Sequence, residues 1–159
     1  MRKFVFALLG AGLAAVAAQP ANAADLSVRI EGLRNHEGLV RLAIFDKPGT
    51  FAESGEQLAD VAVPAAELAT GKPVSVFEGL NPGVYAVVAH HDENANLKFD
   101  TTFIGLPAEG YGFSNDAQAY LSAPAFAEAA FVLGRENVEA AFHIVYWSHT
   151  VAANSADPR

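Results

Sequence analysis

The residues with the clearest chemical pattern form a ten-residue segment near the middle of the chain, from His91 to Asp100. Oxygen-bearing side chains recur there at positions one, three, five and nine of a loop: Asp92, Asn94, Asn96 and Asp100. A tightly wound loop with this spacing can wrap several oxygen atoms around one cation, and the backbone carbonyl of Lys98 would supply position seven. Calcium accepts about six to eight hard oxygen ligands with flexible geometry. The spacing therefore predicts a calcium site.

The loop differs from an EF-hand at two positions. Leu97 stands at position six, where an EF-hand has Gly, and Phe103 stands at position twelve, where it has Glu. Only two of the four side chains carry a charge, so the affinity for calcium should be weak. A purely structural loop is the alternative, because Asn and Asp side chains also stabilise turns by bonding to nearby backbone groups.

Three histidines and one serine are the other candidates for chemistry. His90 and His91 are adjacent on a predicted strand, so they point to opposite faces and cannot chelate one metal ion together. A copper or zinc site would need His143, on the last predicted strand, to meet one of them. The segment 112–116 lacks the final Gly of a nucleophile elbow. Ser114 is therefore predicted to cap a loop, and no residue is assigned as catalytic.

The first 23 residues have the three parts of a secretory signal peptide. Arg2 and Lys3 provide a positive start, residues 4–18 are an apolar run, and Ala21-Asn22-Ala23 is a small-x-small cleavage pattern. The apolar run is short for a bilayer of about 30 Å. We therefore expect cleavage after Ala23, no transmembrane segment in the mature chain, and a periplasmic or secreted location.

The mature part is expected to be a strongly acidic domain without cysteine. The chain has 159 residues and a net charge of −8, and loss of Arg2 and Lys3 with the leader lowers this to −10. An acidic surface repels phosphate backbones, so nucleic acid is not an expected partner. The absence of cysteine excludes thiol catalysis and Cys-based zinc sites. We expect a monomer with an envelope or extracellular ligand that the sequence does not identify.

Alternation of apolar and polar residues predicts β-strands along most of the mature chain. The alternating runs are residues 26–31, 39–45, 58–63, 74–77, 84–91, 130–133 and 138–146. The run 84–91 is apolar on both faces, which places it in the middle of a sheet. The first two runs are expected to pair as a hairpin, and Ala65–Leu68 is expected to form one helical turn.

About seven strands separated by turn signals predict an all-β fold. The expected architecture is a single Greek-key β-sandwich, immunoglobulin-like or prealbumin-like. Residues 92 to about 125 contain Gly, Pro and several aromatic residues, which indicates one long ordered loop. We expect a signal peptide at 1–23, a sandwich domain at 24–149 and a flexible C-terminal tail at 150–159.

Two strings of residues resemble a known family. The first runs from Leu80 to Asn96 and contains Pro82-Gly83-Val84-Tyr85, and the second runs from Gly105 to Asn115. Together they resemble the exported bacterial domain-of-unknown-function family numbered 2141, over about residues 26–146. The resemblance implies a small exported β-sandwich, related in architecture to prealbumin-like and carboxypeptidase regulatory-like domains. It implies no substrate and no catalytic residue.

The resemblance also implies that residues 92–100 and 111–115 form one end of the sandwich. A ligand-binding site at this end is expected to contain His91, Glu109, Tyr111, Phe113, Ser114 and Asn115.

Two classes of function follow from these observations. The first is a noncatalytic exported module, stabilised by a cation, that binds a ligand or an envelope partner at its loop end. The second is a small hydrolase of the transthyretin-like type, which would use His90 or His91 with His143 and an Arg. That type ends in Tyr-Arg-Gly-Ser, whereas this chain ends at 156–159 in Ala-Asp-Pro-Arg, which favours the binding module.

Overall fold

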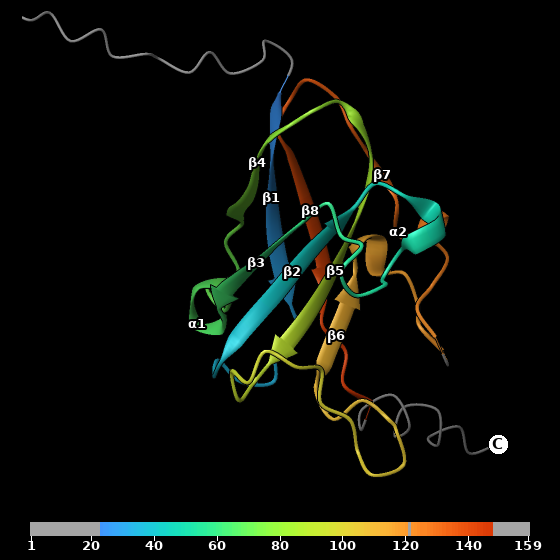
Figure 1. The fold of residues 1–159 in the computed structure, drawn as a ribbon. Coiled ribbons are helices and arrows are strands. Elements are labelled where there is room, and N and C mark those ends of the chain that lie inside the picture. The colour runs from blue at the N-terminus through green and yellow to red at the C-terminus, as the bar shows by residue number, and fades with distance from the viewer. Residues whose placement is uncertain (1–22, 121, 148–159) are drawn as a thin grey trace, which may run out of the picture.

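Strands form at the alternating runs and assemble into two facing sheets (Figure 1). The computed structural model describes residues 23–120 and 122–147. The all-β sandwich that the alternation predicted is confirmed. The expected signal peptide and the expected tail lie outside the described residues, apart from Ala23.

The smaller sheet contains three strands in the order β4 (Val74–Leu80), β1 (Ala24–Glu31) and β8 (Val138–His143). Strand β1 is antiparallel to β4 and parallel to β8. The larger sheet has the order β3 (Ala59–Pro64), β2 (Leu39–Phe45), β5 (Gly83–Asp92) and β6 (Gly110–Phe113), and β7 (Phe131–Leu133) pairs with the start of β5. All pairs in the larger sheet are antiparallel. Strand β5 is central, as its two apolar faces predicted.

Short helical turns connect the strands. They are η1 (Pro48–Thr50), α1 (Ala65–Leu68), η2 (Ser114–Asp116) and α2 (Phe126–Ala129). The helical turn predicted at Ala65–Leu68 is therefore confirmed. In the part of the chain that the structure describes, no helix has the length and apolar character needed to cross a membrane.

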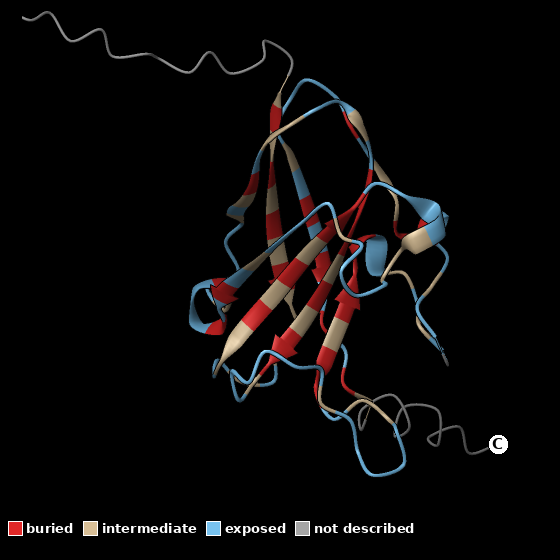
Figure 2. Cartoon of the chain, viewed as in Figure 1, coloured by how far each residue is buried: buried red, intermediate tan, exposed pale blue. Residues whose placement is uncertain are grey.

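The main core lies between the two sheets, and it is built from the inward side of each alternating run (Figure 2). Apolar residues from four of the runs all belong to this one cluster: Val28, Ile30, Val40, Leu42, Val87, Phe142 and Ile144. Alternation along each strand therefore correctly predicted which side chains face the core in both sheets.

The expected hairpin between the first two strands is wrong. Strand β1 belongs to the smaller sheet and β2 to the larger one, so residues 32–38 cross between the sheets. The end of β1 bonds instead to the segment after β8, where the Ile144 N–H donates to the Glu31 carbonyl at 2.8 Å. Gly32 has φ +78° and no side chain. The Ile144 carbonyl oxygen lies 2.8 Å from the place that a Cβ of residue 32 would occupy, so glycine permits this close approach.

A second apolar cluster covers part of the outer face of the larger sheet. Its buried members are Phe45, Ala86, Phe113, Phe126 and Ala129. The ring of Phe51 packs edge-on against Phe45, Phe113 and Phe126, with centroid distances of 5.5, 6.1 and 5.6 Å. The loop after β2 and helix α2 therefore close one half of this face, and the other half is left for the groove described next.

Candidate functional site

The register of three neighbouring strands sets out rows of side chains on the outer face of the larger sheet. Residues paired across β2, β5 and β6 share a face, because side chains alternate along each strand. The first row contains Arg41, His90 and Tyr111, and the second row contains Ala43, Val88 and Phe113. Charged and polar groups thus stand in one row, and apolar groups in the next.

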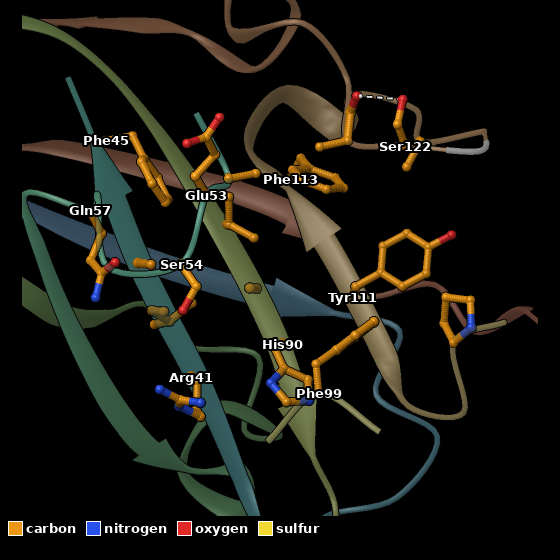
Figure 3. A pocket seen from close by; sticks show the side chains of 18 of the residues that line it. Arg41, Phe45, Glu53, Ser54, Gln57, His90, Phe99, Tyr111, Phe113 and Ser122 are labelled. Carbon is orange, nitrogen blue, oxygen red and sulfur yellow. Dashed lines mark hydrogen bonds between the residues drawn. The ribbon is translucent and has the colours of Figure 1, made fainter. Parts of the chain in front are cut away.

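A groove of about 510 Å³ lies over these rows (Figure 3). The sides are formed by residues 52–54 and 57, by 99 and 105–107, and by 119, 120, 122 and 123, and Trp147 also lines the groove. Figure 3 shows Arg41 and His90 at one end, beside Phe99, and Phe45 at the other. Ligand sites in proteins commonly have volumes of about 300–1,000 Å³, so the groove has room for a small molecule.

Arg41 is the cation of the groove. It is the one Lys or Arg among the described lining residues, and its Nη1 donates to the Leu97 carbonyl at 2.8 Å. It forms no ion pair with a carboxylate in the described part of the chain. Glu53 and Asp60 also line the groove, but both are exposed at its rim.

His90 and Glu109 connect the groove to the Asp92–Asp100 loop. The His90 Nε2–H donates to Glu109 Oε2 at 2.8 Å. The Glu109 side chain, in a residue only 4 % exposed, also accepts the backbone N–H of Glu93 at 3.2 Å and of Asp100 at 3.0 Å. One buried carboxylate therefore holds both ends of the loop and one groove side chain in place.

Three of the four oxygen-bearing side chains of the Asp92–Asp100 loop converge, those of Asn94, Asn96 and Asp100. The buried Asp92 carboxylate accepts the backbone N–H groups of Asn96 at 3.0 Å and Leu97 at 2.8 Å. The side-chain amides of Asn94 and Asn96 donate to Asp100 Oδ2 at 2.7 and 2.9 Å. In this arrangement the loop is closed by its own hydrogen bonds.

The backbone of this loop makes the sharp turn that an EF-hand makes with Gly. Leu97, at position six, has φ +64°, and Ala95 has φ +54°. Among the described residues, no group of three or more His, Asp or Glu side chains is arranged to hold a metal ion. The predicted ligand set has only two carboxylates, and its other oxygens belong to amides and a carbonyl.

His91 points into the sandwich, away from the groove. It is fully buried, and its Nε2–H donates to the Glu37 carbonyl at 2.9 Å, so its Nδ1 accepts the Tyr146 hydroxyl. The Arg34 guanidinium lies 4.4 Å from the Tyr146 ring centre and pairs with Glu93 through an Nε–Oε1 bond of 2.8 Å. The hydrogen bond from Arg34 holds the pKa of Glu93 below its usual value, and burial raises the pKa of Tyr146.

Ser114 and Asn115 brace the fold beside the groove. The buried Ser114 hydroxyl accepts the Val87 N–H at 2.9 Å and donates to the Ala129 carbonyl at 2.6 Å. The Asn115 side-chain amide donates to the Ala130 carbonyl at 2.8 Å. Of the six residues expected to bind a ligand, Tyr111 and Phe113 line the groove, and Glu109 contacts it through His90.

His143 does not meet His90 or His91. It lies at the end of β8 in the smaller sheet, between Asp116 and Glu31, with each ring nitrogen 3.2 Å from a carboxylate oxygen. The convergence that the hydrolase hypothesis or a His-based metal site requires is absent from the described residues.

Arg41, His90 and Phe99 line the groove but were not among the residues expected to bind a ligand. Alternation places Arg41 on the face opposite Val40 and Leu42, which was a usable signal for an outward-facing cation. Its position beside His90 depends on the pairing of β2 with β5, residues far apart in the chain.

Comparison with known proteins places the chain in a family. A family model described as "Uncharacterized protein conserved in bacteria (DUF2141)" matches residues 28–141, from within β1 to within β8. No curated protein and no solved structure matches the chain. The match spans most of the chain and includes the Asp92–Asp100 loop and the β6 segment. The protein therefore belongs to this bacterial family, DUF2141.

Proposed function

We propose that the chain is an exported, noncatalytic module that binds a small and mainly apolar molecule in the groove on the outer face of the larger sheet. The observation that carries the proposal is the groove of about 510 Å³, with aromatic residues in its lining and Val88 and Ala43 from the sheet below. Concave sites with an apolar lining and a few polar groups are typical of small-molecule binding.

The noncatalytic part of the proposal rests on the partners of the candidate chemical groups. The Ser114 hydroxyl is engaged by two backbone groups, and the His90 Nε2–H is engaged by Glu109. His143 lies in the other sheet. Export is supported by the signal-peptide pattern of Met1–Ala23.

Trp147 offers a direct test of the groove, because it is the one tryptophan of the chain and lines the groove. Titration with octan-1-ol should change the Trp147 emission in a saturable way. Phe99→Ala and Tyr111→Ala should each weaken binding about five- to tenfold, through loss of apolar contact area. Val132→Ala, an exposed apolar residue of β7 outside the groove, is the control. No saturable change, or unaltered affinity in both aromatic variants, would contradict the proposal.

The proposal includes weak calcium binding by the Asp92–Asp100 loop. Two observations favour it: the convergence of the Asn94, Asn96 and Asp100 side chains, and the positive φ of Leu97 at position six. A half-turn of each amide would present its oxygen in place of its nitrogen. It would exchange the bonds that Asn94 Oδ1 accepts from the Asn96 N–H at 3.0 Å and Asn96 Oδ1 accepts from the Lys98 N–H at 2.8 Å for bonds to the cation. With two carboxylates, the expected dissociation constant is about 10⁻⁴–10⁻³ M.

Thermal unfolding with and without calcium tests this part. Calcium at about 5 mM should stabilise the fold by about 1–2 kcal/mol, and magnesium by less. Asp100→Asn should abolish the effect, since Asp100 Oδ2 bonds only to the two amides in the loop, whereas Asp92 also holds backbone N–H groups. Asp60→Asn, an exposed carboxylate of β3, is the charge-matched control. An unchanged melting temperature in calcium identifies the loop as purely structural.

A further inference from the structure

We infer that the ligand of this groove is a monocarboxylate with an apolar body, held by its carboxylate at Arg41. The inference rests on the ligand site proposed above and adds the chemical class of the molecule. Three features support it: the charge of Arg41, which pairs with no described carboxylate, the polarity gradient along β2, and the acidic rim.

Arg41 has hydrogen-bonding capacity that the described residues do not use. A guanidinium carries five N–H donors, and the structure shows one of them bound, to the Leu97 carbonyl. The protein has a net charge of −8, yet no described carboxylate pairs with this arginine. The planar fork of a guanidinium matches the two oxygens of a carboxylate. An anionic group with two coplanar oxygens is therefore the complement of this end of the groove.

The outward-facing residues of β2 become less polar from Arg41 to Phe45. The next outward residue of β2 is Ala43, beside Val88, and the one after it is Phe45, which belongs to the second apolar cluster. Arg41 and Phe45 are four residues apart, or about 14 Å at about 3.4 Å per residue. A molecule with a charged end and an apolar body of similar length would place each part against a matching surface.

The acidic side chains limit the ligand to one anionic group. Glu53 lies at the Phe45 end of the groove, away from Arg41 (Figure 3), and Asp60 stands exposed at the rim. A second carboxylate at the far end would be close to Glu53 and would be repelled. The other polar group beside Arg41, the His90 Nε2–H, already donates to Glu109, so Arg41 is the anchor.

Three ligands with the same eight-carbon chain and different head groups separate the contribution of the head group to affinity from that of the apolar chain. Octanoate, octan-1-ol and octylamine are titrated against the mature protein near neutral pH, with Trp147 emission as the readout. Octanoate should bind at least about tenfold more tightly than octan-1-ol, because hydrogen bonds to charged groups are the stronger ones. Octylamine should bind most weakly, since its ammonium would face Arg41.

Substitutions of Arg41 test whether this side chain causes the preference for octanoate. Arg41→Gln should remove the preference for octanoate and leave the affinity for octan-1-ol within about twofold. Arg41→Lys keeps the charge without the fork and should retain part of the preference. Arg135→Gln, which changes the net charge equally outside the groove, is the control, and melting curves establish that each variant is folded.

Each contrary outcome has a distinct meaning. Equal binding of octanoate and octan-1-ol overturns the carboxylate inference and leaves the ligand site standing. A preference for octylamine also overturns it, and assigns recognition to Glu53 and Asp60. An octanoate preference that survives in Arg41→Gln overturns the role of Arg41. Absence of saturable binding by all three ligands contradicts both the inference and the proposed function.

Discussion

At the scale of single residues, buried polar side chains hold the groove in place without lining much of it. Among the described residues, the buried polar or charged ones are Ser114, His91, Asp92 and Glu109. Ser114, His91 and Glu109 each bond to backbone groups of another segment, and Asp92 bonds to backbone N–H groups of its own loop. These residues therefore act on the site through the positions of the strands and loops that they join.

Ser114→Ala should lower the free energy of unfolding by about 1–3 kcal/mol. The substitution leaves the buried Val87 N–H and the Ala129 carbonyl without their hydroxyl partner, and unsatisfied buried polar groups are costly. Urea unfolding of the purified variant measures the change. Ser75→Ala, at an exposed serine of β4, should be nearly neutral. If both variants match the parent, the hydroxyl does not brace the fold as described.

The Arg34–Glu93 pair should make stability depend on pH in acid. The folded pKa of Glu93 lies below its unfolded value of about 4.3, because Arg34 bonds to the ionised carboxylate. The pair therefore contributes fully above that pH, and its contribution is lost as the pH falls through the folded pKa. The stability difference between the parent and Glu93→Gln, from urea unfolding at several pH values, should shrink over this range. A difference that is constant with pH would contradict this origin.

One part of the candidate site could be proposed from the sequence and another could not, for a physical reason. Asp92, Asn94, Asn96 and Asp100 could be proposed as calcium ligands because one short loop carries them, and local spacing is visible in a sequence. Arg41 was missed because its neighbour in the groove comes from β5, and the pairing of strands is not encoded by alternation.

At the scale of elements, β6 positions two groove residues by alternating Gly with aromatic residues. Tyr111 and Phe113 face outward, while Gly110 faces the segment after β8 and Gly112 faces the end of β8. A Cβ on Gly112 would lie 2.3 Å from the His143 carbonyl oxygen. The backbone groups of Tyr111 and Val145 exchange hydrogen bonds of 3.0 and 2.8 Å, which joins the two sheets at this edge. The glycines permit the close approach on which this junction depends.

Gly112→Ala should therefore destabilise the fold, by about 1–3 kcal/mol or more, since the obstructing atom is backbone and cannot rotate away. Urea unfolding measures the loss. Gly134→Ala is a matched control, because no atom lies within 4 Å of its added Cβ. Tolerance of Ala at both positions would show that the β6–β8 contact is looser than described.

The elements themselves were largely predictable, and their partners were not. Strand faces, the central place of β5 and the turn at Ala65–Leu68 follow from local pattern and composition. The separation of β1 from β2 follows from contacts of Gly32 and Glu31 with residue 144, more than a hundred residues away. A hairpin prediction considers only residues that are close in the sequence, so it could not include the contact with residue 144.

At the scale of the whole molecule, one core between the sheets supports a groove on the outside of one of them. Phe142 is the largest of the fully buried side chains and lies in the main core. Phe142→Ala should cost about 3–5 kcal/mol, from lost burial and the cavity left behind. Phe103→Ala should cost almost nothing, since Phe103 is fully exposed. Equal unfolding midpoints for these two variants would contradict the assigned core.

The proposed binding of a small apolar molecule on the outer face of the larger sheet can be tested at individual residues. Methyl chemical shifts of isotope-labelled protein, recorded during titration with octan-1-ol, test it most directly. We expect saturable shifts for Val88, Ala43 and Leu106, which line the groove. Val87 and Val28, in the core between the sheets, should shift little. Shifts confined to other surfaces, or no saturable shift in any groove methyl, would contradict the account.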